Sequence, residues 1–147
     1  MTGSAGWDAR AVVAQREAQR WQGRVWRAHR RVYAATDHGG SLRFSARYNR
    51  GSDQFPEDQV WAALYLALGA EVPLGEILRH ISPEDTADLN EYRLSERAVE
   101  LAAVLDCREA TALGLGSNDL IRDYDFTATQ EITAAAMAQG AVGILVP

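Results

Sequence analysis

Residues 127–146, TATQEITAAAMAQGAVGILV, carry the pattern of a helix followed at once by that of a strand. Thr127 and Gln130 have the spacing of a capping box, which predicts that the helix begins here. Gly140 predicts its end, because glycine readily adopts the left-handed conformation that closes many helices. The apolar run 141–146 then predicts a strand. A helix beside a short strand indicates a mixed fold, either α+β or irregular α/β.

Upstream segments continue this mixture. Apolar residues at steps of three and four predict a helix within residues 1–23, closed by Gly23. These residues are Trp7, Ala11, Ala14, Ala18 and Trp21. Residues 24–33, RVWRAHRRVY, alternate in polarity and predict a strand that places Arg27 and His29 on one face.

The middle of the chain gives weaker signals. Turn residues predict loops at 35–41 and 49–58, with a short strand at 41–44 between them. The apolar run 59–68, QVWAALYLAL, predicts a buried strand, although its periodicity also admits a helix. Pro73 fits the first turn of a helix over 73–81, and Ser82 fits the cap of a short helix after it.

The following residues are partly ambiguous. Residues 92–105 suit a helix or a strand equally well. Asp106 and Glu109 predict a capping box for a short helix that ends near Gly114. With no repeat, linker or low-complexity segment, the chain predicts a single domain over 1–147.

The composition is ordinary for a soluble globular protein. Of the 147 residues 47% are hydrophobic and 24% are charged, which argues against disorder. No apolar run approaches the roughly 18 residues of a spanning helix, and the first ten residues lack a signal-peptide layout. One cysteine, Cys107, excludes an internal disulfide and is expected to be buried. Glu76 and His80 have metal-ligand spacing without a second pair, so no metal is expected.

Positive charge is concentrated in the first third of an acidic chain. All 15 strongly basic residues are arginine, and the net charge is -5; a GC-rich gene explains most of the preference for arginine. Residues 1–50 hold ten arginines and three acids, a balance of +7, and residues 51–147 hold five arginines and 17 acids, a balance of -12. The pI of 5.2 argues against a nucleic-acid surface. The basic segment therefore indicates a local anion site.

Position alone marks three residues as candidates. Arg27, in the middle of a predicted strand, must reach solvent or meet an anion. Glu76 lies beside apolar residues in a predicted helix, where it is either exposed or functional. Tyr65 is a core aromatic on the pattern alone.

Several segments, in this order, resemble the RES domain family, the toxin half of RES–Xre bacterial toxin–antitoxin pairs. They are VWRAH, RFSARYNRG, LYLALGAEVPLGEILRH, VLDC and DYDFTATQEITAAAMAQGAVGILVP. The resemblance runs from residue 24 to residue 147. It implies an α+β fold of small twisted, mainly antiparallel sheets flanked by helices, similar to that of ADP-ribosyltransferases.

The resemblance also implies a function. The protein is expected to be a cytoplasmic bacterial toxin that arrests growth by cleaving the nicotinamide–ribose bond of NAD, its substrate. Phosphorolysis, hydrolysis and ADP-ribosyl transfer stay open as the reaction. The implied partner is an Xre-type helix-turn-helix antitoxin, in a homodimer or a hetero-oligomer, with no nucleic-acid or membrane partner. The alternative is a non-catalytic or truncated domain that binds NAD or ADP-ribose and only docks on the antitoxin.

Four residues match the family motifs directly. Arg27 of VWRAH matches the first family arginine and Arg47 of ARYN the loop arginine, while Tyr65 and Glu76 match the tyrosine and the glutamate. Arginine forks suit the pyrophosphate of NAD, and a tyrosine can stack on nicotinamide. Glu76 and Arg27 are the implied catalytic residues, and Glu76 would bond a ribose hydroxyl and stabilise the positive charge that develops on the ribose.

The remaining positions have supporting roles in this interpretation. His29 either orients phosphate or ribose or packs in the fold. Tyr48 stands where the family often has tryptophan; it is counted among the residues that bind NAD and, with Asn49, is expected to shape the loop that presents Arg47. Arg43 and Arg50 are expected to be solvated. A serine often follows the family's terminal Val-Pro, whereas Pro147 is the last residue here. The alternatives are a shortened chain, another group in that role, or an impaired protein.

Overall fold

The computed structural model of the protein describes residues 6–81 and 83–147. These residues form two compact units. Unit 1 takes its residues from Met1–Trp21, Ser41–Ala63 and Leu101–Pro147, and unit 2 from Gln22–Gly40 and Leu64–Glu100. The single domain expected from the sequence stays a prediction.

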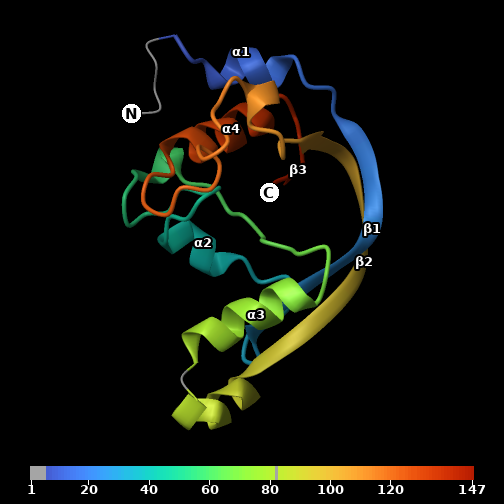
Figure 1. Ribbon diagram of the computed structural model, residues 1–147, viewed down its shortest axis with the longest axis vertical. Coiled ribbons are helices and arrows are strands. Elements are labelled where there is room, and N and C mark those ends of the chain that lie inside the picture. The colour runs from blue at the N-terminus through green and yellow to red at the C-terminus, as the bar shows by residue number, and fades with distance from the viewer. Residues whose placement is uncertain (1–5, 82) are drawn as a thin grey trace. The chain divides into compact units, whose positions relative to one another are not determined.

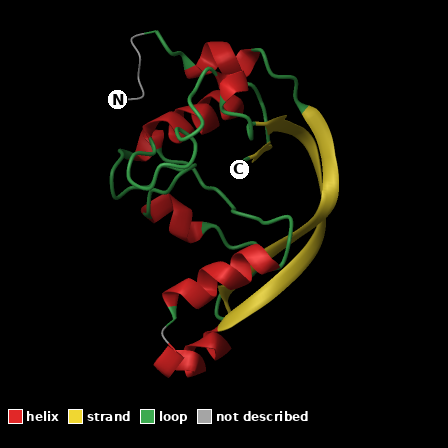
Figure 2. Ribbon diagram, in the orientation of Figure 1, coloured by secondary structure: helices red, strands yellow, loops and turns green. Residues whose placement is uncertain are grey.

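Helices and strands alternate in a mixed α+β arrangement, so the expected fold class is confirmed (Figures 1 and 2). The α-helices are α1 (Ala9–Ala14), α2 (Gly39–Arg43), α3 (Glu71–His80) and α4 (Thr127–Ala138). The strands are β1 (Gln19–Arg30), β2 (Tyr92–Asp106) and β3 (Gly143–Leu145). Short 3-10 helices cover η1 (Glu57–Gln59), η2 (Pro83–Glu91) and η3 (Thr111–Leu113). Among the described residues, no helix has the length and apolar content to cross a membrane.

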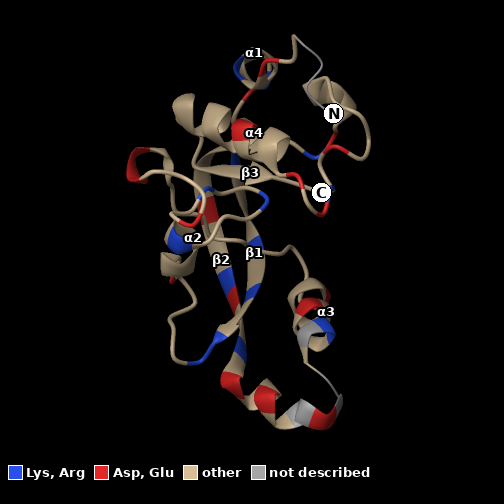
Figure 3. Cartoon of the chain, turned by 90° about the vertical axis from the view of Figure 1, so that its left-hand side faces the viewer, with Lys and Arg blue, Asp and Glu red and all other residues tan. Residues whose placement is uncertain are grey.

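The three strands form one sheet in the order β1-β2-β3. Bonds between β1 and β2 run from the ion pair Arg24–Glu96 to the backbone bond from Arg31 to Glu91, so the two strands are antiparallel. The charged residues within β1 are all arginines, whereas β2 carries both basic and acidic residues (Figure 3). β3 pairs in parallel with the end of β2, where Leu105 lies beside Ile144. The strand predicted at 141–146 is thereby confirmed, and the ambiguity over 92–105 is resolved as a strand.

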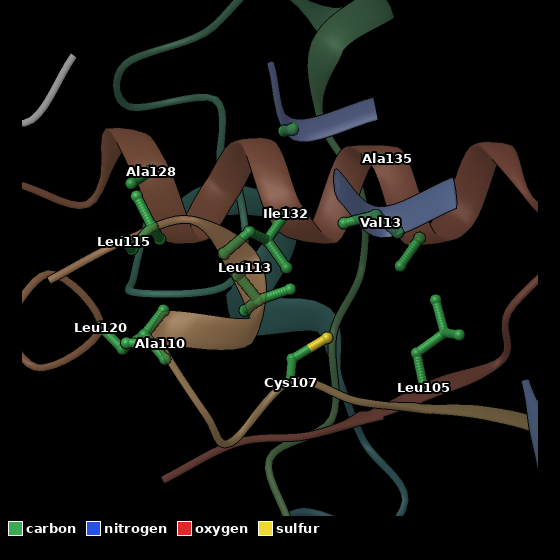
Figure 4. Close-up of a cluster of buried hydrophobic side chains, with 12 residues drawn as sticks. Val13, Leu105, Cys107, Ala110, Leu113, Leu115, Leu120, Ala128, Ile132 and Ala135 are labelled. Carbon is green, nitrogen blue, oxygen red and sulfur yellow. The ribbon is translucent and has the colours of Figure 1, made fainter. Parts of the chain in front are cut away.

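The core of unit 1 packs α1 and η3 against α4 (Figure 4). Its most buried members include Val13 and Ile132, both fully inaccessible, and Leu105 at the end of β2. Cys107 lies in this core as predicted, and burial raises the pKa of its thiol to about 11. The N-terminal segment, β2 and α4 thus meet in one apolar cluster.

The N-terminal helix is shorter than predicted. α1 covers only Ala9–Ala14, and the prediction of helix through Trp21 is wrong because β1 begins at Gln19. The Asp8 carboxylate accepts a hydrogen bond from the Arg10 N–H at the start of α1. At its end, the Arg16 N–H bonds to the Val13 carbonyl, which tightens the last turn. Pairing with β2 then supplies the partners that a longer helix would have supplied.

Two predicted strands are absent at their expected places. Residues 41–44 lie largely in α2, which begins where the Asp37 carboxylate accepts the Gly39 N–H. Residues 59–68 are not a buried strand: Gln59 ends η1, and the described residues after it pair with β1 only through a bridge between Ala67 and Trp26. Leu64 and Leu66 are 37% and 40% exposed. The apolar composition of this run therefore did not predict its burial.

The predicted helix ends at Gly114 and Gly140 are confirmed, and α4 begins at Thr127 as predicted. Gly114 and Gly140 adopt left-handed φ angles of 73° and 85° after η3 and α4. Neither capping box forms. Asp106 instead accepts the backbone and side-chain N–H groups of Arg108, which lowers the pKa of its carboxyl group. The helix predicted after Gly69 forms as α3, and its expected successor forms as η2, while the predicted cap Ser82 lies outside the described residues.

Candidate functional site

The predicted site residues divide between the two units. Unit 2 contains Arg27, His29, Tyr65 and Glu76, whereas unit 1 contains Arg47 and Tyr48. Each group has its own local framework, β1 and its neighbours in unit 2 and the loop 43–51 in unit 1.

Arg27 lies on β1, and the end of its side chain is held in place. Its Nη1 donates a hydrogen bond to the Ala35 carbonyl in the turn that follows the strand. Burial lowers the pKa of the guanidinium, and the Asp37 carboxylate partly offsets this effect. Because the ordinary pKa of arginine is so high, the group stays charged. A half-buried, anchored cation of this kind is suited to bind an anion.

His29 is buried beside it along the strand, with 8% of its surface exposed. Its Nδ1 lies 2.9 Å from the Arg30 carbonyl and its Nε2 lies 2.7 Å from the Ser95 hydroxyl. A neutral ring satisfies both contacts if Nδ1 donates and Nε2 accepts from the hydroxyl. This geometry favours the packing role of His29 over the ligand-binding one.

Tyr65 and Glu76 are both accessible in unit 2. Tyr65 is 43% exposed and lies two residues before Ala67, which bridges to Trp26 of β1. Glu76 is exposed on α3, together with Leu74 and Leu78, which are 44% and 61% exposed. Leu74 and Leu78 lie one turn apart on one face of the helix, and Glu76, two residues from each, lies on a different face.

In unit 1, the side chain of Arg47 is oriented by the segment before α4. Its Cζ lies 5.0 Å from the centre of the Phe126 ring, and its Nη1 donates to the Leu120 carbonyl at 3.1 Å. The Asp123 carboxylate is 3.9 Å away but 99% exposed, so this ion pair contributes little. The guanidinium is therefore fixed by a ring and a carbonyl more than by a counter-charge.

The loop that carries Arg47 is closed by Asn49, which is 1% exposed. Its side-chain amide donates to the carbonyls of Ser41 and Phe44, at 2.8 and 2.9 Å, and so satisfies the end of α2. Tyr48 is 7% exposed and contributes its carbonyl, which accepts from the Trp61 indole at 3.1 Å. Both residues shape the loop, as the sequence suggested.

Two residues for which the sequence predicts no role at this loop hold it in place. Thr129 donates its hydroxyl to the Arg47 carbonyl. Gln130 donates its side-chain amide to the Ala46 and Asn49 carbonyls, at 3.0 and 3.1 Å. The sequence pattern predicts Gln130, together with Thr127, as a capping box and does not single out Thr129.

Arg50 does not lie at a solvated edge, and that expectation is wrong. Its Cζ lies between the rings of Phe55 and Trp61, 5.0 and 5.2 Å from their centres. Aromatic faces attract the delocalised cation, so Arg50 joins the loop to the segment that follows it. Arg43 is exposed, as expected.

No group of three or more potential metal ligands occurs among the residues that the structure describes. The expectation that the protein uses no metal stays a prediction.

Comparisons with known proteins give one family match and one structural match. The RES domain family matches residues 24–147. A chain in the crystal structure of the M. tuberculosis MbcT–MbcA toxin–antitoxin complex has the same fold, with a TM-score of 0.73 and 26% identity. That match covers 95% of this chain and 75% of the other. The sequence comparison with curated proteins finds no match.

Proposed function

This chain belongs to the RES domain family, and from that premise we propose that it is the NAD-consuming toxin of a bacterial toxin–antitoxin system. The family match over residues 24–147 carries the proposal. The likeness to a chain of a toxin–antitoxin complex supports it. We further propose an Xre-type antitoxin as the partner and the cytoplasm as the place of action.

The residues of unit 2 supply the chemistry in this proposal. Arg27 binds a phosphate oxygen of NAD through its anchored guanidinium. Tyr65 stacks on the nicotinamide ring, whose positive charge is attracted to the aromatic face. Glu76 accepts a hydrogen bond from a ribose hydroxyl and stabilises the positive charge that grows at C1′. The exposure of Tyr65 and Glu76 supports these roles, since a bound ligand must reach them.

The reaction breaks the bond between ribose C1′ and the nicotinamide nitrogen. The bonding electrons leave with nicotinamide, which becomes neutral, so no general acid has to protonate the leaving group. An oxocarbenium-like ribose then accepts a nucleophile at C1′. With water or phosphate, the nucleophile loses its proton and gives ADP-ribose or its 1″-phosphate. With a protein side chain, the product is an ADP-ribosylated protein.

Product analysis tests the proposal. The purified chain is incubated with NAD in three arms, without phosphate, with inorganic phosphate and with a cell lysate, and the products are separated by mass. Nicotinamide release in any arm supports the proposal, and the second product identifies the acceptor. Saturable binding of NAD without nicotinamide in all arms would select the non-catalytic alternative. If the chain neither binds NAD nor releases nicotinamide, both the catalytic proposal and the non-catalytic alternative are refuted.

A further inference from the structure

We propose that Phe126, Thr129 and Gln130, here called the α4 platform, are positioning residues that hold Arg47 ready to bind phosphate. This inference rests on the proposed function, and it takes Arg47, which matches the family's loop arginine, to be a second phosphate ligand of NAD. All of its contacts lie within unit 1. The platform acts on the backbone of the arginine loop and on the guanidinium itself.

The backbone is held by two adjacent helix residues. Thr129 is 1% and Gln130 5% exposed. Together they donate to the carbonyls of Ala46, Arg47 and Asn49. A buried glutamine is costly unless both amide hydrogens find acceptors, and here both do. The loop is thereby fastened to a twelve-residue helix instead of to another loop.

The guanidinium is held by the residue that precedes the helix. The Phe126 ring covers one face of Arg47, and the Leu120 carbonyl engages one terminal nitrogen. The plane of the fork is therefore set before any ligand arrives. A ligand that binds a preoriented arginine spends less free energy on ordering that side chain. Positioning thus acts through affinity, because phosphate lies away from the bond that breaks.

The platform can be weakened without removing the arginine. Gln130→Met keeps the length of the side chain but loses both hydrogen-bond donors. Thr129→Val keeps the shape but loses the hydroxyl, and Thr129→Ser keeps it. We expect Gln130→Met and Thr129→Val each to raise the KM for NAD about tenfold and to leave kcat within about threefold, the pattern of lost uniform binding. Thr129→Ser is expected to restore the wild-type KM.

Gln139→Met is the matched control, because Gln139 is exposed at the opposite end of the same helix. Amide hydrogen exchange of residues 43–51 is measured for every variant beside the kinetics. Faster exchange in Gln130→Met than in Gln139→Met, together with the higher KM, supports positioning. If the wild-type protein is active and its KM for NAD is unchanged in Gln130→Met, Thr129→Val and Gln139→Met, the inference is overturned. The proposed function is then left intact.

The two proposals fail in different ways. If the wild-type chain neither binds nor cleaves NAD, the proposed function fails, and exchange still decides whether the platform orders the loop. If Gln130→Met does not fold, the same kinetic and exchange measurements are made on Thr129→Val and Phe126→Leu instead. A loss of kcat with unchanged KM in these variants would also overturn positioning by affinity.

Discussion

Asn49 gives a quantitative test of how the arginine loop is built. Its amide nitrogen bonds to the carbonyls of Ser41 and Phe44, at 2.8 and 2.9 Å, in a site where the residue is 1% exposed. Asn49→Ala leaves both acceptors without this donor. An unsatisfied buried group costs about 1–3 kcal/mol, so we expect a loss of about 2–4 kcal/mol. That is a large share of the roughly 5–15 kcal/mol of a typical domain.

Asn49→Asp sharpens the test through pH. The carboxylate has the same shape but faces two carbonyl oxygens without a donor, so the folded state should raise the pKa of this carboxyl above its unfolded value of about 4. Because the pKa is raised in the folded state, the extra loss of stability is small at pH values below the pKa of the unfolded state. The loss grows as the pH rises through the pKa of the folded state. The variant should therefore be closer to wild type at pH 4.5 than at pH 7.5.

Urea unfolding at both pH values measures these effects. Tryptophan fluorescence is a suitable probe, because the Trp61 indole is bonded to the Tyr48 carbonyl in the same loop. Asn118→Asp serves as the control, since Asn118 is exposed in the same unit. The account of the loop is refuted if Asn49→Ala loses less than about 0.5 kcal/mol, or if both aspartate variants show the same pH dependence.

Gly51 and Cys107 give two further predictions. A Cβ at Gly51 would lie 2.6 Å from backbone atoms of Phe44, so Gly51→Ala should cost more than about 2 kcal/mol in urea unfolding. Gly40 has no atom within 4 Å of its Cβ position, so Gly40→Ala should cause no loss of stability. Equal effects of the two substitutions would contradict the close packing at Gly51. Burial raises the pKa of the Cys107 thiol from 9.0 to about 11, so the unfolded state loses this proton first as the pH rises. The free energy of unfolding should fall by up to about 2.7 kcal/mol between pH 9 and 11. Cys107→Ala should lack this decline when its unfolding is measured over the same pH range. Parallel pH profiles for the two proteins would contradict the prediction.

Local patterns predicted the elements whose signals are local. The helix ahead of Gly140 and the strand after it follow from periodicity and from a left-handed glycine, and both need only neighbouring residues. Residues 59–68 show the limit of this reasoning. Their composition is that of a buried strand, but burial depends on what covers them, and the structure gives them one bridge to β1.

The candidate site shows the same limit. The position of Arg27 in a predicted strand indicated anion binding, whereas Arg47 was singled out among its neighbouring arginines by the family resemblance. The partners of His29 and Gln130 could not be predicted, because Ser95 lies 66 positions from His29 and the Ala46 carbonyl lies 84 positions from Gln130. Capping spacing near Gln130 was a true signal of a polar role, but tertiary contacts gave the side chain different acceptors.

The most direct test of the central claim is the rate of nicotinamide release from NAD by the purified chain and by Glu76→Gln. Glu71→Gln is the matched control, because Glu71 is exposed on the same helix. We expect wild-type protein and Glu71→Gln to release nicotinamide at similar rates and Glu76→Gln to be slower by about a hundredfold or more, as for the loss of a group that stabilises the transition state. Equal rates in all three proteins would remove Glu76 from catalysis, and no release by the wild-type chain would contradict the claim that it consumes NAD.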